Sequence, residues 1–129
     1  GVAVVLITHN LGIVAEFCDT VQVMYAGRMV EAAGVAEVIA HPLHPYTEAM
    51  LGSIPQPGGA ASTRLPSIPG FPPDLAALPP GCSFEPRCPY GQEREICRQQ
   101  APAPEVLDLD TGWAMAECHF ARERVGGPR

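Results

Sequence analysis

The sequence predicts an α/β fold, because a run that is apolar at every position is followed by the patterns of a short helix and a hairpin. Residues 2–7 form that run. A strand that is apolar on both faces is typical of a parallel sheet with helices on either side. The elements that would cover it do not precede it here, so we expect residues 1–129 to be the end of a larger protein.

The next predicted elements are a helix and a hairpin. Asn10 can cap a helix over residues 11–17, where apolar side chains recur at the helical spacing and form one face. Residues 21–25 alternate, with Val, Val and Tyr on one side. A tight turn at residues 26–27 can then lead into residues 28–31, which predicts an antiparallel hairpin.

Two further short helices are predicted after the hairpin. Gly34 precedes a helical pattern over residues 35–40. Each residue before a proline is biased away from helix, so residues 41–45 are typical of a turn. Pro45 then suits the first position of another helix, over residues 46–51, because its missing amide hydrogen would be unpaired there in any residue.

Composition divides the chain into parts. Prolines and glycines are concentrated in the middle of the chain, and such stretches favour extended backbone. We therefore expect residues 1–53 to form the α/β piece and residues 54–80 to form a Pro/Gly-rich extended connector. Residues 81–121 form an irregular cysteine-rich region, and residues 122–129 form a tail.

The charged residues exclude two functions. The chain has 14 acidic and 8 basic residues and a net charge of −6, whereas a nucleic-acid surface needs clustered Lys and Arg. It contains no Lys, so it cannot hold a phosphate-binding loop of the G-x-x-x-x-G-K-[ST] type.

No apolar stretch reaches the roughly 20 residues that cross a bilayer. We expect a soluble chain, or one that partners hold at a membrane.

Four of the five cysteines are grouped in the last part of the sequence and suggest one shared site: Cys82, Cys88, Cys97 and Cys118. Their gaps are wider than those of the short Cys-x-x-Cys knuckles typical of zinc sites. An iron–sulfur cluster tolerates wide gaps because its corners lie apart, and a Cys-Pro step recurs in such sites. On chemistry alone, zinc, two disulfides and unliganded thiols remain alternatives.

Five segments together resemble a known family: residues 5–15 (VLITHNLGIVA), 23–31 (VMYAGRMVE), 41–47 (HPLHPYT), 68–73 (IPGFPP) and 81–89 (GCSFEPRCP). The first two resemble the last part of an ABC-transporter ATPase domain. The other three narrow the resemblance to the ATP-binding subunits of oligopeptide and dipeptide ABC importers. The resemblance covers residues 1 to about 120, and it implies the C-terminal part of a P-loop ABC ATPase domain, with a partial sheet and helices.

The resemblance also implies roles for single residues. His9 matches the switch histidine, which contacts the γ-phosphate of ATP; from the residues alone, a histidine that caps the next helix is the simpler interpretation. The four grouped cysteines match those that hold a 4Fe–4S cluster. His119, beside Cys118, could replace one of them as a ligand, although an exposed side chain is the simpler interpretation. ATP and Mg²⁺ are the implied cofactors of the intact subunit.

The implied function is that of the ATP-hydrolysing subunit that powers import of dipeptides and oligopeptides, held at the cytoplasmic face of the cell membrane. Its implied partners are transmembrane permease subunits, a second ATP-binding subunit and, indirectly, a peptide-binding protein. We expect residues 1–129 by themselves to lack ATPase activity, since they contain no phosphate-binding loop. The alternative is a metal-stabilised docking or regulatory module with no nucleotide chemistry. A redox enzyme is a third possibility, without any flavin, haem or nicotinamide motif to support it.

Overall fold

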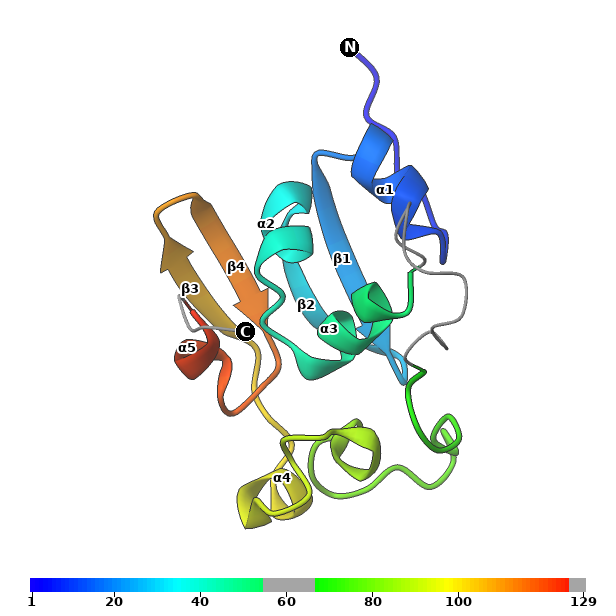
Figure 1. Cartoon of the computed structure of the whole chain (residues 1–129), viewed down its shortest axis with the longest axis vertical. Helices are drawn as coiled ribbons and strands as arrows, with labels where there is room; N and C mark the ends of the chain where they lie inside the picture. Colours follow the sequence, from blue (N-terminus) through cyan, green and yellow to red (C-terminus); the bar gives the residue numbers. More distant parts are fainter. Residues whose placement is uncertain (55–66, 126–129) are drawn as a thin grey trace, which may run out of the picture.

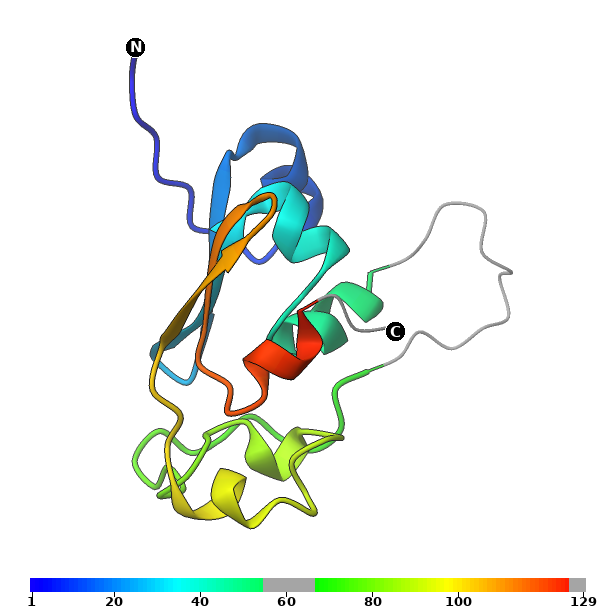
Figure 2. The same cartoon turned by 90° about the vertical axis from the view of Figure 1, so that its left-hand side faces the viewer.

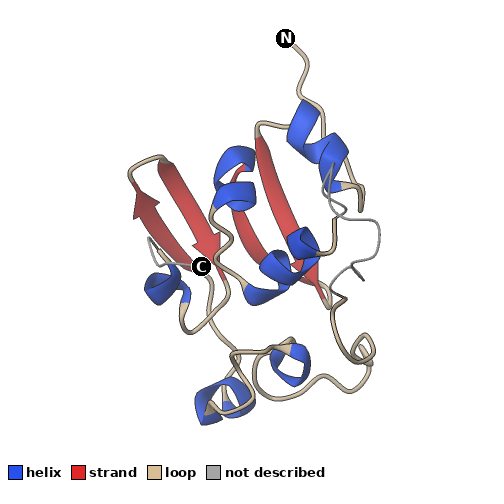
Figure 3. Ribbon diagram, viewed as in Figure 1, coloured by secondary structure: helices blue, strands red, loops and turns tan. Residues whose placement is uncertain are grey.

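The structure is a computed structural model that describes residues 1–54 and 67–125. These residues form one four-stranded antiparallel sheet with the strand order β1-β2-β4-β3 (Figures 1 and 3). Its strands are β1 (Thr20–Tyr25), β2 (Arg28–Gly34), β3 (Glu105–Leu109) and β4 (Gly112–Ala116). Because β2 pairs with β4, two hairpins from distant parts of the sequence share one sheet.

The mixed α/β composition is confirmed, but the predicted buried strand does not form. Residues 2–7 project from the body without regular structure (Figure 1), and Val2 and Ile7 are 90% and 95% exposed. A strand needs neighbours for its amide and carbonyl groups, and none lies beside this segment in the described ranges. The prediction of a parallel sheet is also wrong for these residues, since a sheet built from hairpins is antiparallel.

The helices predicted in the first half are confirmed as α1 (Leu11–Phe17), α2 (Val35–Ala40) and α3 (Pro45–Gly52). Asn10 caps α1, since its Oδ1 accepts a hydrogen bond from the Gly12 amide at 3.0 Å. Pro45 occupies the first turn of α3, as its fixed φ favours. Local sequence rules therefore suffice for these three elements.

The first hairpin turns where the sequence predicts. Ala26 and Gly27 have φ values of +51° and +77°. A two-residue hairpin turn of this kind needs left-handed backbone at both central positions, which glycine adopts freely. β1 and β2 pair along their whole length, with a shift of register between Val23 and Met24.

Helices α2, α3 and α5 (Ala121–Arg124) lie on the same face of the sheet (Figure 2). The covered face has small side chains where the two hairpins meet: Ala33 of β2 pairs with Ala114 of β4, and each is 1% exposed. Short side chains let helices pack close to the strands, and α2 contacts both β1 and β2. On the opposite face, Val106 and Trp113 are 65% and 49% exposed.

A buried carboxylate ties the start of α3 to the sheet. Glu31 of β2 is 1% exposed. Its Oε1 accepts a hydrogen bond from the Leu43 amide at 2.7 Å, and its Oε2 accepts one from the His44 amide at 2.9 Å. Burial raises the pKa of Glu31, while the hydrogen bond from Leu43 acts in the opposite direction. The backbone amides just before a helix have no hydrogen-bond acceptor within that helix. The Glu31 carboxylate of β2 supplies the acceptors for the amides of Leu43 and His44.

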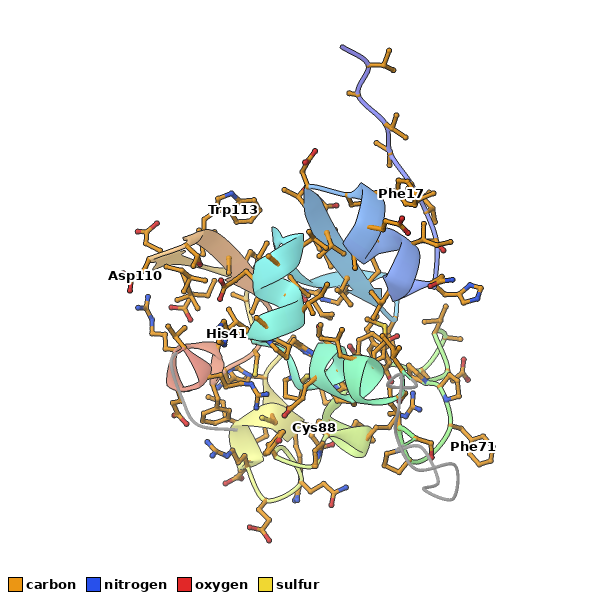
Figure 4. All side chains as sticks on the ribbon, turned by 45° about the horizontal axis from the view of Figure 1, so that its top comes forward. Phe17, His41, Phe71, Cys88, Asp110 and Trp113 are labelled. Carbon is orange, nitrogen blue, oxygen red and sulfur yellow. The ribbon has the colours of Figure 1, made fainter. Side chains whose placement is uncertain are left out.

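The cysteine-rich region holds more regular structure than predicted. It contains the 3₁₀ helix η1 (Glu85–Arg87), α4 (Glu95–Gln99) and the β3–β4 hairpin, and α5 begins at its last residue and continues into the predicted tail. Figure 4 shows Asp110 and Trp113 near the tip of that hairpin, pointing away from the body. Residues 67–80 of the predicted connector run without helix or strand, and residues 55–66 lie outside the described ranges. In the described ranges no helix is both long and apolar enough to span a membrane.

Candidate functional site

The four grouped cysteines line one small cavity of about 30 Å³. Three come from irregular segments or turns and one, Cys97, comes from α4. In Figure 4, Cys88 lies in the region of α4 and η1, beside α3. Other side chains and backbone of the wall come from both halves of the chain and include His44, Glu85, Tyr90, Gly91, His119 and Phe120. Folding thus brings together the residues that the sequence grouped.

Gly81 lets two of the cysteine segments cross. The Cys82 amide donates a hydrogen bond to the Cys97 carbonyl oxygen at 2.8 Å. A Cβ atom on Gly81 would lie 2.2 Å from that oxygen and 2.5 Å from the Arg98 carbonyl carbon. Both distances are far inside van der Waals contact, so only a residue without a Cβ permits the crossing.

Phe84 anchors the segment between Cys82 and Cys88 to the main core. Its side chain is 1% exposed, and its ring centroid lies 5.2 Å from that of Tyr25 in β1 and 5.5 Å from that of Tyr46 in α3. Aromatic pairs at such distances stabilise beyond the area that they bury. The sheet therefore holds the cysteine loop through one aromatic cluster.

Short-range hydrogen bonds shape the chain around Cys88. Its amide donates to the Glu85 carbonyl at 3.0 Å, and its carbonyl accepts from the Gly91 amide at 3.3 Å. A Cβ atom on Gly91 would lie 3.4 Å from the Cys88 Sγ atom. This turn packs directly on the thiol and leads the chain into α4, which carries Cys97.

Burial disfavours the thiolate form of the four cavity cysteines. All five in the chain are free, so the disulfide alternative is not realised. Burial raises the pKa of Cys82 to about 11 and raises the pKa of Cys88, Cys97 and Cys118 as well. Metals bind thiolates, so loading of this site would release protons.

The side chains around the cavity do not converge on a single point. In residues 1–54 and 67–125, no three His, Cys, Asp or Glu side chains are grouped closely enough to hold a metal ion. Cys18, the one cysteine outside the group of four, follows the end of α1 and does not line the cavity. The metal assignment to the other four cysteines therefore stays a prediction.

Two histidines in the cavity wall have fixed hydrogen bonds. His44 Nδ1 accepts from the Tyr46 amide at 3.1 Å and so caps α3. Burial lowers the pKa of His44 to about 4, which keeps its ring neutral. His119 Nε2 lies 2.9 Å from the Gln100 carbonyl, to which it can only donate. The sequence indicated His119, which is next to Cys118, as a possible ligand. It did not indicate His44, because His44 is far from the cysteines in the sequence and no local pattern shows that the two come into contact.

His9 lies far from the cysteines. It is exposed, just ahead of the cap of α1, and Figure 1 places α1 and α4 at opposite ends of the molecule. Its neighbour Asn10 makes the capping bonds to α1, so the simpler interpretation of His9 as the helix cap is wrong. The nucleotide role of His9 is untested by these contacts and stays a prediction.

A second cavity of about 110 Å³ adjoins the first, and His44 and Cys82 line both. Its other wall holds an ion pair in which Arg28 Nε and Nη2 lie 2.9 and 3.0 Å from the two carboxylate oxygens of Glu117. This two-bond pair joins β2 to the segment after β4, one residue before Cys118. The positive charge of Arg28 is balanced by the carboxylate of Glu117, so this pair adds no net charge to the cavity wall.

The chain is similar to ATP-binding proteins of peptide transporters. "Oligopeptide transport ATP-binding protein OppD" of Mycobacterium tuberculosis is 50% identical over 111 residues, which are 86% of this chain and 18% of the relative. "Probable peptide ABC transporter ATP-binding protein y4tR" of Sinorhizobium fredii is 49% identical over 125 residues, which are 97% of this chain and 36% of the relative. The Escherichia coli OppD protein is 45% identical over 103 residues, which are 80% of this chain and 30% of the relative.

The chain thus spans about a third or less of the length of these relatives. A family description matches residues 30–97, a stretch that runs from β2 through α4 and includes three of the four cavity cysteines. The matched stretch contains both Gly81, at the crossing of the cysteine segments, and Phe84, which anchors them. This chain belongs to the family described as the oligopeptide/dipeptide transporter C-terminal region.

Proposed function

We propose that this chain works as the C-terminal part of an ATP-binding subunit that powers import of dipeptides and oligopeptides. The family match over residues 30–97 carries the proposal, and the names of the relatives support it. The intact subunit would bind ATP and Mg²⁺ at the cytoplasmic face of the membrane. Its closure on a second ATP-binding subunit would move the permease subunits, which take the peptide from a separate binding protein.

Within that function, His9 is the residue of this chain that reaches the nucleotide. Its side chain is exposed and no hydrogen bond within the described ranges occupies its ring. An imidazole there can contact the γ-phosphate and order the surroundings of the attacking water. The phosphate-binding lysine must come from another part of the subunit, since this chain has no Lys.

A chimera tests this function. The matching C-terminal part of the Escherichia coli relative is replaced with this chain, and ATP turnover and peptide uptake are measured in cells that lack the native subunit. We expect the chimera to hydrolyse ATP and restore uptake, and His9→Ala to lower turnover by about 100-fold, the scale of one positioned proton-handling group. His41→Ala is the matched control, because His41 is also exposed and ends α2.

Three results would count against parts of the proposal. An unaltered chimera that folds but restores no uptake contradicts the transport function. Full turnover in the His9→Ala chimera contradicts the role of His9 while leaving the transport function in place. Reduced turnover in the His41→Ala control would mean that any exposed histidine affects the chimera equally.

We further propose that Cys82, Cys88, Cys97 and Cys118 hold a 4Fe–4S cluster. The support is that these four thiols, and not Cys18, line one cavity that is largely apolar and anchored to the core through Phe84. A cluster has separated corners, so it suits thiolates that approach from separate loops without converging on one point. The cluster would supply a rigid link between the segments that carry its ligands, and the chain's residues would exclude water from it.

Metal analysis tests the cluster. The chain is purified without oxygen, and iron, acid-labile sulfide and zinc are counted. We expect about four iron and four sulfide per chain, as the cluster type requires, and loss of both in each Cys→Ser variant of the four cavity cysteines. Cys18→Ser is the matched control and should keep the full content. One zinc per chain with no sulfide would instead identify a zinc site.

The second candidate is a docking or regulatory module. The exposed apolar side chains of Val106 and Trp113, on the open face of the C-terminal hairpin, favour it. The chimera distinguishes the two functions. A Cys82→Ser chimera that keeps its ATP turnover but loses uptake would mean that the cysteine region acts in docking to a partner.

A further inference from the structure

Residues 67–80, here called the strap, run without helix or strand between the main body and the cysteine-rich region (Figure 1). The large apolar side chains in the middle of the strap face solvent. Phe71 and Leu75 are 92% and 67% exposed, and Figure 4 shows Phe71 pointing away from the body. Apolar packing of these side chains therefore does not hold the middle of the strap in place.

Arg87 of η1 holds the first part of the strap. Its Nε donates a hydrogen bond to the Pro69 carbonyl oxygen at 2.8 Å, and its Nη2 donates one to the Ile68 carbonyl oxygen at 3.3 Å. Its Nη1 donates to the Tyr25 hydroxyl of β1, also at 3.3 Å. Hydrogen bonds from a charged donor are stronger than those between neutral groups. These three bonds, here called the latch, tie the strap to η1 and to the sheet.

Gly70 provides the turn on which the latch depends. Its φ is +75°, in the left-handed region that glycine adopts without steric cost. A Cβ atom at this position would lie 3.7 Å from the Arg87 Cγ atom. The turn therefore rests on the Arg87 side chain and presents the Pro69 carbonyl to its guanidinium group.

The last part of the strap forms part of the wall of the second cavity. Leu78 and Pro79 line this cavity of about 110 Å³. Val30 of β2 lines it as well and is 3% exposed. The strap ends at Gly81, where its backbone crosses closely over that of Cys97. The strap is thus fixed at one end by the latch and at the other by this crossing.

We propose that the strap is a lid on the second cavity, with the crossing at Gly81 as its fixed end and Arg87 as the residue that latches it shut. When the latch breaks, residues 68–79 can lift Leu78 and Pro79 away from the cavity. Solvent and small solutes then reach the wall that Val30 forms and the part of Cys82 that lines this cavity. The inference goes beyond the proposed function and does not require a metal at the cysteines.

An introduced thiol in the cavity wall tests the lid. Val30→Cys is made in the full chain, and alkylation at position 30 by iodoacetamide is followed without denaturant by mass spectrometry. We expect Arg87→Gln to raise this rate about 10-fold, the scale of one charge-assisted hydrogen bond lost from the closed state. Arg98→Gln is the matched control, because Arg98 is 59% exposed, pairs with Glu85 and does not line the cavity. Cys18, outside both cavities, should react at the same rate in every chain.

Gly70→Ala breaks the latch without changing Arg87. Alanine is strained at a φ of +75°, and opening of the strap relieves the strain, so the rate at position 30 should rise in this variant too. A rise in Arg87→Gln without one in Gly70→Ala would mean that Arg87 acts on η1 alone, which overturns the lid. Equal rates in Arg87→Gln and Arg98→Gln overturn it as well. So does a rise at position 30 that Cys18 matches, since global unfolding would then explain both.

Discussion

Gly81→Ala is expected to destabilise the chain by about 3 kcal/mol or more, near the upper end of the usual cost of overpacking. The added Cβ atom would lie 2.2 Å from the Cys97 carbonyl oxygen. That neighbour is backbone, so it cannot rotate away, and the segments of Cys82 and Cys97 must separate. The hydrogen bond between them, 2.8 Å long, would break. Urea unfolding followed by circular dichroism measures the loss of stability.

Gly52→Ala is the matched control for Gly81→Ala. Gly52 is exposed at the end of α3, and an added Cβ atom would meet no atom within 4 Å. We expect this variant to be unchanged or stabilised by up to about 1 kcal/mol, because alanine restricts the unfolded chain. A Gly81→Ala chain as stable as the Gly52→Ala chain would contradict the close crossing of the cysteine segments.

Glu31→Ala is expected to lower the free energy of unfolding by about 4 kcal/mol. It leaves the amides of Leu43 and His44 without acceptors, and each unpaired buried donor costs roughly 1–3 kcal/mol. It also opens a cavity between β2 and α3, where Glu31 is 1% exposed. Part of the cost is offset because the variant no longer buries a carboxylate, whose pKa is raised by that burial.

Two variants bracket this expectation in the same unfolding measurement. Glu16→Ala, on the exposed side of α1, should stay within about 0.5 kcal/mol of the unaltered chain, as surface substitutions usually do. Glu31→Gln keeps the size of the side chain and one acceptor oxygen, so its free energy of unfolding should lie between those of Glu31→Ala and Glu16→Ala. If Glu31→Ala unfolds at the same urea concentration as Glu16→Ala, the bonds from Leu43 and His44 do not hold α3 to the sheet.

Local patterns predicted the first half of the chain well. The cap at Asn10, the turn at residues 26–27 and the proline at the start of α3 all act within a few residues of the chain, so sequence rules describe them. The strand expected at residues 2–7 failed for the opposite reason. Its apolar pattern is real, but a strand forms only against neighbours, and in the described ranges it has none.

The sequence also grouped the four cysteines correctly but could not identify what surrounds them. His44 and Pro45 line the cavity from the start of α3, far along the chain from the cysteines. Neither belongs to a local pattern that involves a cysteine. Phe120 also lines the cavity and lies under Arg94, whose guanidinium carbon is 3.7 Å from its ring centroid.

The sequence by itself therefore determined the three short helices of the first half, the first hairpin, the family and the choice of four cysteines, because each depends on residues close in the chain or on motifs that occur in order. Only the tertiary structure decided that β2 pairs with β4 and that one sheet carries both halves. It also decided that Glu31 is buried and that Phe84 packs against Tyr25 and Tyr46 of the main core. Those features arise from contacts between distant segments, whose geometry is set by packing and strand pairing and not by any local preference of the residues involved.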